Sequence, residues 1–338
     1  MTNFSLTFNA GARIATLLVF LLIFAASGFH TGDAFAAPDK KPTTKAVTKK
    51  ASLKSPAKLK KVVRAPAVPD TGKDGFPNVL SHAAVVYDAT TGRSLYAKNA
   101  DNAMPIASIT KLMTAMVVLD AKQNLDEAVV IADADIDTLK LSRSRLPVGA
   151  AFRREDLMRL ALMASDNRAA AALGRTYPGG SVAFVAAMNS KASSLRLQQA
   201  HFVDPTGLAP GNVASPQDLA LLVAAASEYK MIREFSTTPE LHVTLPDSGK
   251  QIGFNNTNSL VKSAAWNIGL SKTGFINEAG KCLVMQATVN NNPVVIVLLD
   301  SWGKLTRIGD ANRVKKWLET AKVSPLGVAP FGTAKAVG

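Results

Sequence analysis

Residues 107–120 constrain the fold more than any other part of this chain. After Ser108 the stretch is apolar on nearly every side, and a helix that is apolar all round lies in a protein interior. Lys111 falls inside it, although burying an unpaired ammonium group is costly. Lys111 follows Ser108 by three residues, so the two side chains share one face near the helix start. A serine beside a desolvated amine is a candidate for an activated nucleophile.

The Ser-X-X-Lys spacing does not identify a nucleophile by itself. A simpler interpretation is that Ser108 is only the N-cap residue of the helix. The same spacing recurs, without a buried helix after it, at Ser55, Ser227, Ser259 and Ser301. The role of Ser108 therefore has to be judged together with the other motifs of the chain.

A second motif is Ser165-Asp166-Asn167, within the segment LALMASDNRAAAAL. The alanines that follow it are consistent with close helix packing, so the motif is placed where one helix meets a helical lobe. A hydroxyl and an amide two residues apart can both point into a cleft. The alternative is that Ser165 and Asn167 only cap the local backbone.

A third motif is Lys272-Thr273-Gly274, within NIGLSKTGF, which has the pattern of an edge strand. Lys272 offers a fixed positive charge, Thr273 offers a hydroxyl, and Gly274 lets another backbone come close. A peptide lying along such an edge would gain main-chain hydrogen bonds. The alternative is a solvated lysine before a turn.

The periodicity of the chain predicts strands, then a long helical block, then strands. Residues 83–87 and 94–97 form a hairpin pattern around a glycine-containing turn. Residues 126–252 are mainly helical in pattern, and residues 282–289 and 294–299 are nearly continuous apolar strands of the kind that is covered on both faces. Helices are predicted at 154–163, at 181–195, after the N-cap pair Ser215-Pro216, and at the apolar face of Ala311, Val314, Trp317, Leu318 and Ala321.

This order of elements predicts an α/β (α+β) fold. The expected architecture is one mostly antiparallel sheet built from both ends of the folded region, flanked by helices and carrying an inserted helical lobe. The predicted boundaries of this domain are residues 76–323, with a flexible C-terminus at 324–338. The active site is expected in the cleft between lobe and sheet.

The N-terminal region indicates export. Residues 14–26 form an apolar core of signal-peptide length, and Ala34-Phe35-Ala36 supplies a small-X-small cleavage site, so residues 1–36 are predicted to be a cleavable signal peptide. The alternative is an uncleaved anchor, although the apolar run is short for a membrane span. We expect a periplasmic or cell-envelope protein.

Residues 37–75 form a basic tail with eleven Lys and Arg residues against three Asp, which is more than half of the formal net charge of +14. With only scattered apolar residues it cannot bury a core, and the composition predicts disorder. Nucleic acid is an unsuitable partner for an exported chain. An anionic envelope polymer and a simple solvated spacer remain the two interpretations.

Cysteine and histidine chemistry is poorly supported. Cys282 is the only cysteine, so no intramolecular disulfide is possible, and its apolar setting indicates an inert core thiol. Outside the signal segment the histidines are His82, His201 and His242, none of them in a Gly-X-Ser-X-Gly or His-Glu-X-X-His context. We expect neither a metal nor another cofactor.

In this order, the three motifs are characteristic of penicillin-binding proteins and class A β-lactamases. The chain closely resembles the low-molecular-mass penicillin-binding D-alanyl-D-alanine endopeptidases, a branch of the serine D,D-peptidases. The resemblance covers residues 79–323 but not the lysine-rich tail. It is carried by PIASITKLMTAMVVLDAK, SRLPVGAAFRREDLMRLALMASDNRAAA, FVDPTGL, NTNSLV and KTGFINEAGKCLVM.

The resemblance implies catalytic roles for three side chains. Ser108 would attack the carbonyl of a D-alanyl peptide bond and form an acyl-enzyme. Lys111 would take the serine proton, and Ser165 would relay a proton to the leaving amine. The backbone N–H groups of Ser108 and Phe275 would form the oxyanion hole, which is usually worth several kcal/mol.

The resemblance also implies a binding set and a class of ligands. Asn167 would hold the substrate amide, while Lys272 and Thr273, with Gly274 beside them, would bind the substrate carboxylate. The ligands would be peptidoglycan peptides, with β-lactam antibiotics as covalent inhibitors. Burial and repulsion between Lys111 and Lys272 would disfavour the charged form of each, so that Lys111 could act as a neutral base.

Three rival functions differ in what they require. A class A β-lactamase needs a deacylating glutamate, and no Glu-X-X-X-Asn segment occurs between Asn167 and Lys272. A catalytically silent wall-binding protein would not need Ser108 or Lys111. A D-alanyl-D-alanine carboxypeptidase shares all three motifs. Two features argue against a carboxypeptidase. The local sequence around Lys272 resembles the endopeptidases, and residues 324–338 are too few for the additional β-domain and amphipathic helix of many carboxypeptidase relatives.

Overall fold

The computed structural model describes residues 69–245, 248–303 and 305–320. The predicted signal peptide, nearly all of the basic tail, and the predicted C-terminus at 324–338 lie outside these residues. Asp70 and Thr71, near the end of the predicted tail, are inside them. Thr71 forms a β-bridge with Pro77, and Asp70 pairs with Lys316 at 2.6 Å. Within the described ranges, no helix has the length and apolar character to cross a membrane.

The centre of the fold is a five-stranded sheet in the order β2-β1-β11-β10-β9. Every neighbouring pair in it is antiparallel. The first two strands come from one end of the domain and the last three from the other, which confirms the sheet predicted from the sequence. The strands are β1 (Ala83–Asp88), β2 (Arg93–Lys98), β9 (Asn267–Ile276), β10 (Gly280–Val289) and β11 (Asn292–Ser301).

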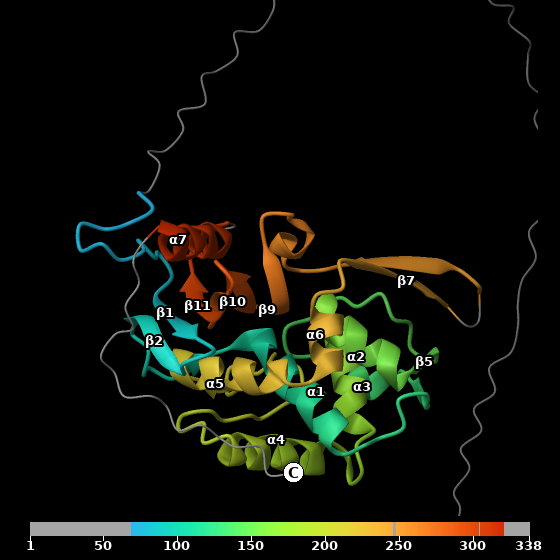
Figure 1. Cartoon of the computed structure of the whole chain (residues 1–338). Helices are drawn as coiled ribbons and strands as arrows, with labels where there is room; N and C mark the ends of the chain where they lie inside the picture. Colours follow the sequence, from blue (N-terminus) through green and yellow to red (C-terminus); the bar gives the residue numbers. More distant parts are fainter. Residues whose placement is uncertain (1–68, 246–247, 304, 321–338) are drawn as a thin grey trace, which may run out of the picture. The chain divides into compact units, whose positions relative to one another are not determined.

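Helices cover both faces of this sheet (Figure 1). The helix α7 (Thr306–Thr320) packs on β10 and β11 from one side, and α5 (Pro216–Ser227) packs on them from the other. Alternate residues of β10 therefore enter different cores: Val284 joins the α5 side, and Met285 joins the α7 side. This two-sided burial explains why the strand is apolar almost throughout.

The remaining helices form the helical lobe. The prediction at Arg154–Met163 is confirmed, and the predicted helix at 181–195 is offset by one residue. The Ser215 hydroxyl caps α5 by accepting a 3.1 Å hydrogen bond from the Asp218 N–H. The lobe consists of α1 (Thr110–Asp120), α2 (Arg154–Met163), α3 (Asn167–Arg175), α4 (Gly180–Ser194) and α6 (Lys230–Ser236).

The prediction that residues 126–252 are mainly helical missed several short strands. These strands are too short to carry a clear period, and they pair in twos outside the main sheet. The longest pair is a hairpin that runs alongside the lobe, with Leu241 and Val243 packed against the lobe core (Figure 1). The pairs are β3 (Met104–Pro105) with β6 (Val213–Ala214), β4 (Ala128–Val130) with β5 (Ala151–Arg153), and β7 (Glu240–Thr244) with β8 (Gln251–Asn255).

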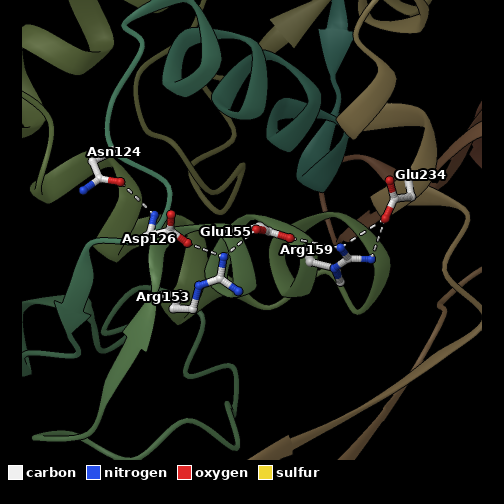
Figure 2. A network of polar contacts seen from close by, with 6 residues as sticks. All are labelled: Asn124, Asp126, Arg153, Glu155, Arg159 and Glu234. Atoms are coloured by element: carbon white, nitrogen blue, oxygen red, sulfur yellow. Dashed lines mark hydrogen bonds and ion pairs between the residues drawn. The ribbon is translucent and has the colours of Figure 1, made fainter.

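A surface network of charged side chains joins the start of α2 to α6 (Figure 2). The Arg159 guanidinium contacts Glu155 and Glu234, each at 3.2 Å, and also lies 3.9 Å from the centre of the Phe235 ring. Such exposed pairs stabilise a fold by less than about 1 kcal/mol each. The full network comprises Asn124, Asp126, Arg153, Glu155, Arg159 and Glu234.

Candidate active site

Ser108 lies in a tight turn before the buried helix. A 3₁₀ turn at Ala107–Ile109 leads directly into α1, and Ala107 has a positive φ of 49°. The Ser108 hydroxyl lies 2.8 Å from the Lys111 amine. Neither helix start, at Ile106 or at Ile109, uses a side-chain cap. The N-cap interpretation of Ser108 is therefore wrong, because its side chain is engaged by Lys111.

Lys111 is fully buried, as the apolar helix required. Its Nζ lies 2.8 Å from Ser108 Oγ, 2.6 Å from Asn167 Oδ1 and 2.6 Å from the Thr206 carbonyl oxygen. The last two atoms can only accept hydrogen bonds. A neutral amine would therefore donate its two N–H groups to Asn167 and Thr206. Its lone pair would then be directed at the Ser108 hydroxyl, as a general base requires.

The electrostatics favour this neutral form. Burial lowers the pKa of Lys111 to about 7, against the opposing effect of three carboxylates, which are Asp204, Asp166 and Asp137. Burial also lowers the pKa of Lys272 well below its usual value, helped by the charges of Lys111 and Arg307. Repulsion between the two lysines therefore acts on Lys272, whereas Lys111 owes its low pKa to burial.

The orientation of the Asn167 amide follows from its neighbours. Asn167 Nδ2 donates to Ser142 Oγ at 2.7 Å, and Ser142 Oγ donates to Asp137 Oδ2 at 2.6 Å. A carboxylate can only accept, so Ser142 uses its single proton on Asp137 and must accept from Asn167. The amide then has to present Oδ1 to Lys111. The sequence analysis did not assign a role to Ser142 or Asp137, which lie just before the quoted segment SRLPVG that begins at Ser144.

Within the second motif, the central residue is the helix cap. Asp166 Oδ1 accepts a 2.9 Å hydrogen bond from the Ala169 N–H at the start of α3. Ser165 has a positive φ of 58°, and its hydroxyl accepts a 2.8 Å hydrogen bond from Lys272 Nζ. The alternative that Ser165 and Asn167 cap the backbone is therefore wrong. Both side chains point toward a buried lysine instead.

The third motif lies on the edge strand β9, as predicted. Lys272 is only 1% exposed, so the alternative of a solvated lysine is wrong. Its Nζ contacts Ser165 Oγ and the Thr273 carbonyl oxygen at 2.8 and 2.9 Å. The Thr273 hydroxyl lies 2.7 Å from that of Thr257, which belongs to the segment NTNSLV.

Gly274 is required where β9 meets the turn that carries Ser108. A Cβ atom at this position would lie 2.8 Å from the Ile106 carbonyl oxygen and 3.3 Å from the Ser108 nitrogen. The glycine thus brings β9 within van der Waals contact of the backbone of the nucleophile. Phe275, the next residue, has a side chain that is 55% exposed.

The turn after Asp204 supports the same backbone from the other side. Asp204 accepts hydrogen bonds from the Thr206 and Gly207 N–H groups at 2.6 and 2.8 Å, which fixes the Thr206 carbonyl against Lys111. Gly207 has a φ of 80°, and a Cβ on it would lie 2.0 Å from the Ala107 carbonyl oxygen. The turn was predicted from Asp-Pro-Thr-Gly, but its contact with Lys111 was not.

The cysteine and the possible metal ligands of the described residues lie outside this chemistry. Cys282 is buried, and burial raises the pKa of its thiol to about 11, so it is an inert core residue as expected. Over the ranges that the structure describes, no group of His, Cys, Asp and Glu side chains is arranged to hold a metal ion.

A helical lobe and a sheet edge here bring together two serines, each bonded to a buried lysine, Ser108 with Lys111 and Ser165 with Lys272. This arrangement defines a penicillin-recognising type of serine peptidase site. Residues 70–303 match the peptidase S11 family, described as D-alanyl-D-alanine carboxypeptidase. The chain belongs to this family.

Similar proteins include two named D-alanyl-D-alanine endopeptidases. The one from Pseudomonas aeruginosa is 48% identical over 260 residues, which cover 76% of this chain and 84% of the relative. The one from Escherichia coli is 44% identical over 259 residues, with 77% and 84% covered. Among solved structures, the Streptomyces K15 DD-transpeptidase is 29% identical, with a TM-score of 0.67 and coverage of 72% of this chain and 98% of that one.

Proposed function

We propose that the protein is a serine D,D-peptidase that hydrolyses D-alanyl bonds of peptidoglycan through an acyl-enzyme. The observation that carries the proposal is the buried Lys111 amine, 2.8 Å from Ser108 Oγ, with its other contacts made to two carbonyl oxygens. A buried amine of this kind does not stabilise the fold, because removing it from water is costly. It is well placed to accept a proton from the serine.

The reaction begins when Ser108 Oγ attacks the D-alanyl carbonyl carbon and gives its proton to Lys111 Nζ. The carbonyl oxygen becomes an oxyanion, which the N–H groups of Ser108 and Phe275 stabilise. Collapse breaks the C–N bond, and the proton that Lys111 took up passes through the Ser165 hydroxyl to the leaving amine, so that Lys111 is neutral again. Water then attacks the ester at Ser108 with the same base, which releases the shortened peptide.

The substrate lies along the outer edge of β9, which is unpaired within the main sheet. Lys272 and Thr273 bind its carboxylate, and Asn167 holds its amide. The close approach at Gly274 brings this edge to the Ser108 backbone. A β-lactam antibiotic presents a carbonyl and a carboxylate to the same groups and would acylate Ser108. The absence of a class A type glutamate predicts slow deacylation.

The bond cut is assigned as the cross-link from D-alanine to diaminopimelate. A D-alanyl-D-alanine terminus has the same reacting core, so the three motifs do not separate the two substrates. The assignment rests on the names of the two relatives at 48% and 44% identity, both D-alanyl-D-alanine endopeptidases. The site would then have to let a long side chain and its attached strand leave.

We therefore predict that cross-linked muropeptide dimers are split faster than free D-alanine is released from pentapeptides. The measurement is a chromatographic time course on both substrates with one enzyme preparation, using Ser108→Ala as the blank. Release of D-alanine while dimers persist would make the protein a carboxypeptidase and leave Ser108 and Lys111 in their roles.

We also propose that the protein is exported to the cell envelope and that its basic tail holds it on an anionic polymer there. The tail, with eleven Lys and Arg residues against three Asp, is the support for this. Deleting residues 40–68 should leave hydrolysis of a small soluble substrate unchanged and weaken sedimentation with whole cell wall. Added salt should weaken sedimentation of the full chain likewise. Salt-insensitive, tail-independent sedimentation would make the tail a spacer.

A further inference from the structure

The proposed function fixes the direction in which a substrate runs along β9. The leaving-group carboxylate lies at Lys272 and Thr273, and the reacting carbonyl lies at the Ser108 and Phe275 N–H groups. The chain on the acyl side of that carbonyl must therefore continue past Phe275, toward the turn between β9 and β10. This turn contains Glu278, three residues beyond Phe275.

One charged contact joins this turn to the helical lobe. Lys140 Nζ lies 2.6 Å from Glu278 Oε1, and the two residues are 138 positions apart in the sequence. Their side chains are 26% and 40% exposed, so both are accessible to a ligand. The pair joins the loop at residues 137–142 to the turn between β9 and β10, on the side where the acyl part of the substrate would lie.

Lys140 is held at this position by the same carboxylate that orders the catalytic side chains. Asp137 accepts hydrogen bonds from the backbone N–H groups of Leu139, Lys140 and Ser142, each at 2.9 Å. Ser142 in turn orients Asn167. Asp137 thus holds the backbone of residues 139–142 beside Asn167, and this backbone sets where the Lys140 side chain begins.

Exposed apolar side chains belong to the same two segments as the pair, and Lys281 Nζ lies 4.7 Å from the centre of the Phe275 ring. Leu139 and Leu141, on either side of Lys140, are 59% and 78% exposed, and Phe275 on β9 is also largely exposed. Exposed apolar side chains next to a salt bridge suit a ligand with an aliphatic stem and a charged end. A free zwitterionic end could exchange partners with the pair, its carboxylate meeting Lys140 and its ammonium meeting Glu278, so that no charge loses its counter-ion.

We propose that Lys140 and Glu278 form a specificity subsite for the zwitterionic end of the amino-acid side chain that precedes the reacting D-alanine. This inference rests on the proposed function, and it deepens that function by naming what the enzyme recognises on the acyl side. In a peptidoglycan stem, diaminopimelate has the required chemistry, with an aliphatic chain that ends in an amine and a carboxylate on one carbon. The subsite distinguishes this residue from one with a single charge or none.

The test pairs two variants with three substrates and uses the full chain. The substrates are synthetic cross-linked peptides that contain a D-alanyl-diaminopimelate bond, and the residue before the reacting D-alanine is diaminopimelate, its side-chain carboxamide, or its side-chain N-acetyl form. The variants are Lys140→Met and Glu278→Gln. The control is Lys315→Met, which breaks a pair with Glu319 on α7 of similar exposure, 21% and 38%. Titration with a fluorescent penicillin counts the folded enzyme in each preparation.

We expect each variant to affect only the substrates that carry the group its side chain would bind. Lys140→Met should raise KM about tenfold on the diaminopimelate and N-acetyl peptides and should have no effect on the carboxamide, which lacks the partner of Lys140. Glu278→Gln should act on the diaminopimelate and carboxamide peptides and spare the N-acetyl form. An equal change in KM on all three substrates, whether a rise or a fall, would overturn the proposal. The pair would then only stabilise the contact between the lobe and the sheet. If the wild type cleaves none of the peptides, the proposed function itself fails.

Discussion

Replacing Lys111 by alanine should reduce acylation of Ser108 by a factor of about 10³ or more while the protein remains folded. General bases typically contribute 10²–10⁴-fold, and this base has no substitute nearby, because Lys272 is engaged with Ser165 and the Thr273 carbonyl. Lys111→Met tests the same loss while filling most of the volume. The measurement is the second-order rate of labelling by a fluorescent penicillin, with circular dichroism as the check on folding.

The chain offers a matched control for this prediction. Lys230 follows Ser227 at the same spacing, but it is exposed at the start of α6. Lys230→Ala should therefore leave labelling unchanged. Full labelling of folded Lys111→Met would contradict the role of Lys111 as the base.

The same mechanism sets the pH dependence of the wild type. Because burial lowers the pKa of Lys111 to about 7, the amine is protonated below that value and free to accept a proton above it. Labelling should therefore fall about tenfold for each pH unit on the acid side and level off on the alkaline side. The residual labelling of Lys111→Met should lack this acid limb, since the group that titrates is gone.

Replacing Gly207 by alanine should destabilise the protein by about 3–5 kcal/mol and abolish labelling of Ser108. The added Cβ would lie 2.0 Å from the Ala107 carbonyl oxygen, a backbone atom that cannot move without displacing Ser108. Thr206, whose carbonyl contacts Lys111, would be displaced with it. The measurement is urea unfolding, read together with penicillin labelling.

The Gly149→Ala variant separates the effect of the steric clash from the free-energy cost of a side chain at positive φ. Its φ of 88° is close to the 80° of Gly207, but a Cβ there would meet no atom within 4 Å. Gly149→Ala should therefore cost only about 1 kcal/mol, the ordinary penalty for a side chain at positive φ, and should retain labelling. Equal losses of unfolding free energy in the two variants would show that the contact with Ala107 does not contribute to the destabilisation.

The main features of the fold could be predicted because they have local patterns. The buried helix after Ser108 is apolar on all faces, and the paired strands β10 and β11 are apolar throughout because helices cover both sides. The hairpin of β7 and β8 was missed because five-residue strands of alternating exposure carry a weak period beside long helices.

The site was predicted through its three motifs, whereas the side chains that orient them were not. Ser142 and Asp137 act through hydrogen bonds to Asn167, which is 25 residues further along, and no local pattern reports such a contact. The pair of Lys140 with Glu278 is formed only when the lobe meets the sheet. The cap at Asp166 was not predicted for a different reason: in a Ser-Asp-Asn segment all three residue types can cap a helix, so the sequence does not show which one does.

The most direct test of the central claim is to locate the covalent adduct that benzylpenicillin leaves on the full chain. The protein is incubated with the antibiotic, digested, and mapped by mass spectrometry, with Ser108→Ala treated in parallel. We predict one penicilloyl group per chain, on Ser108, and none on the variant. An adduct on Ser227, Ser259 or Ser301, each of which also has a lysine three residues later, would contradict the assignment of Ser108 as the nucleophile.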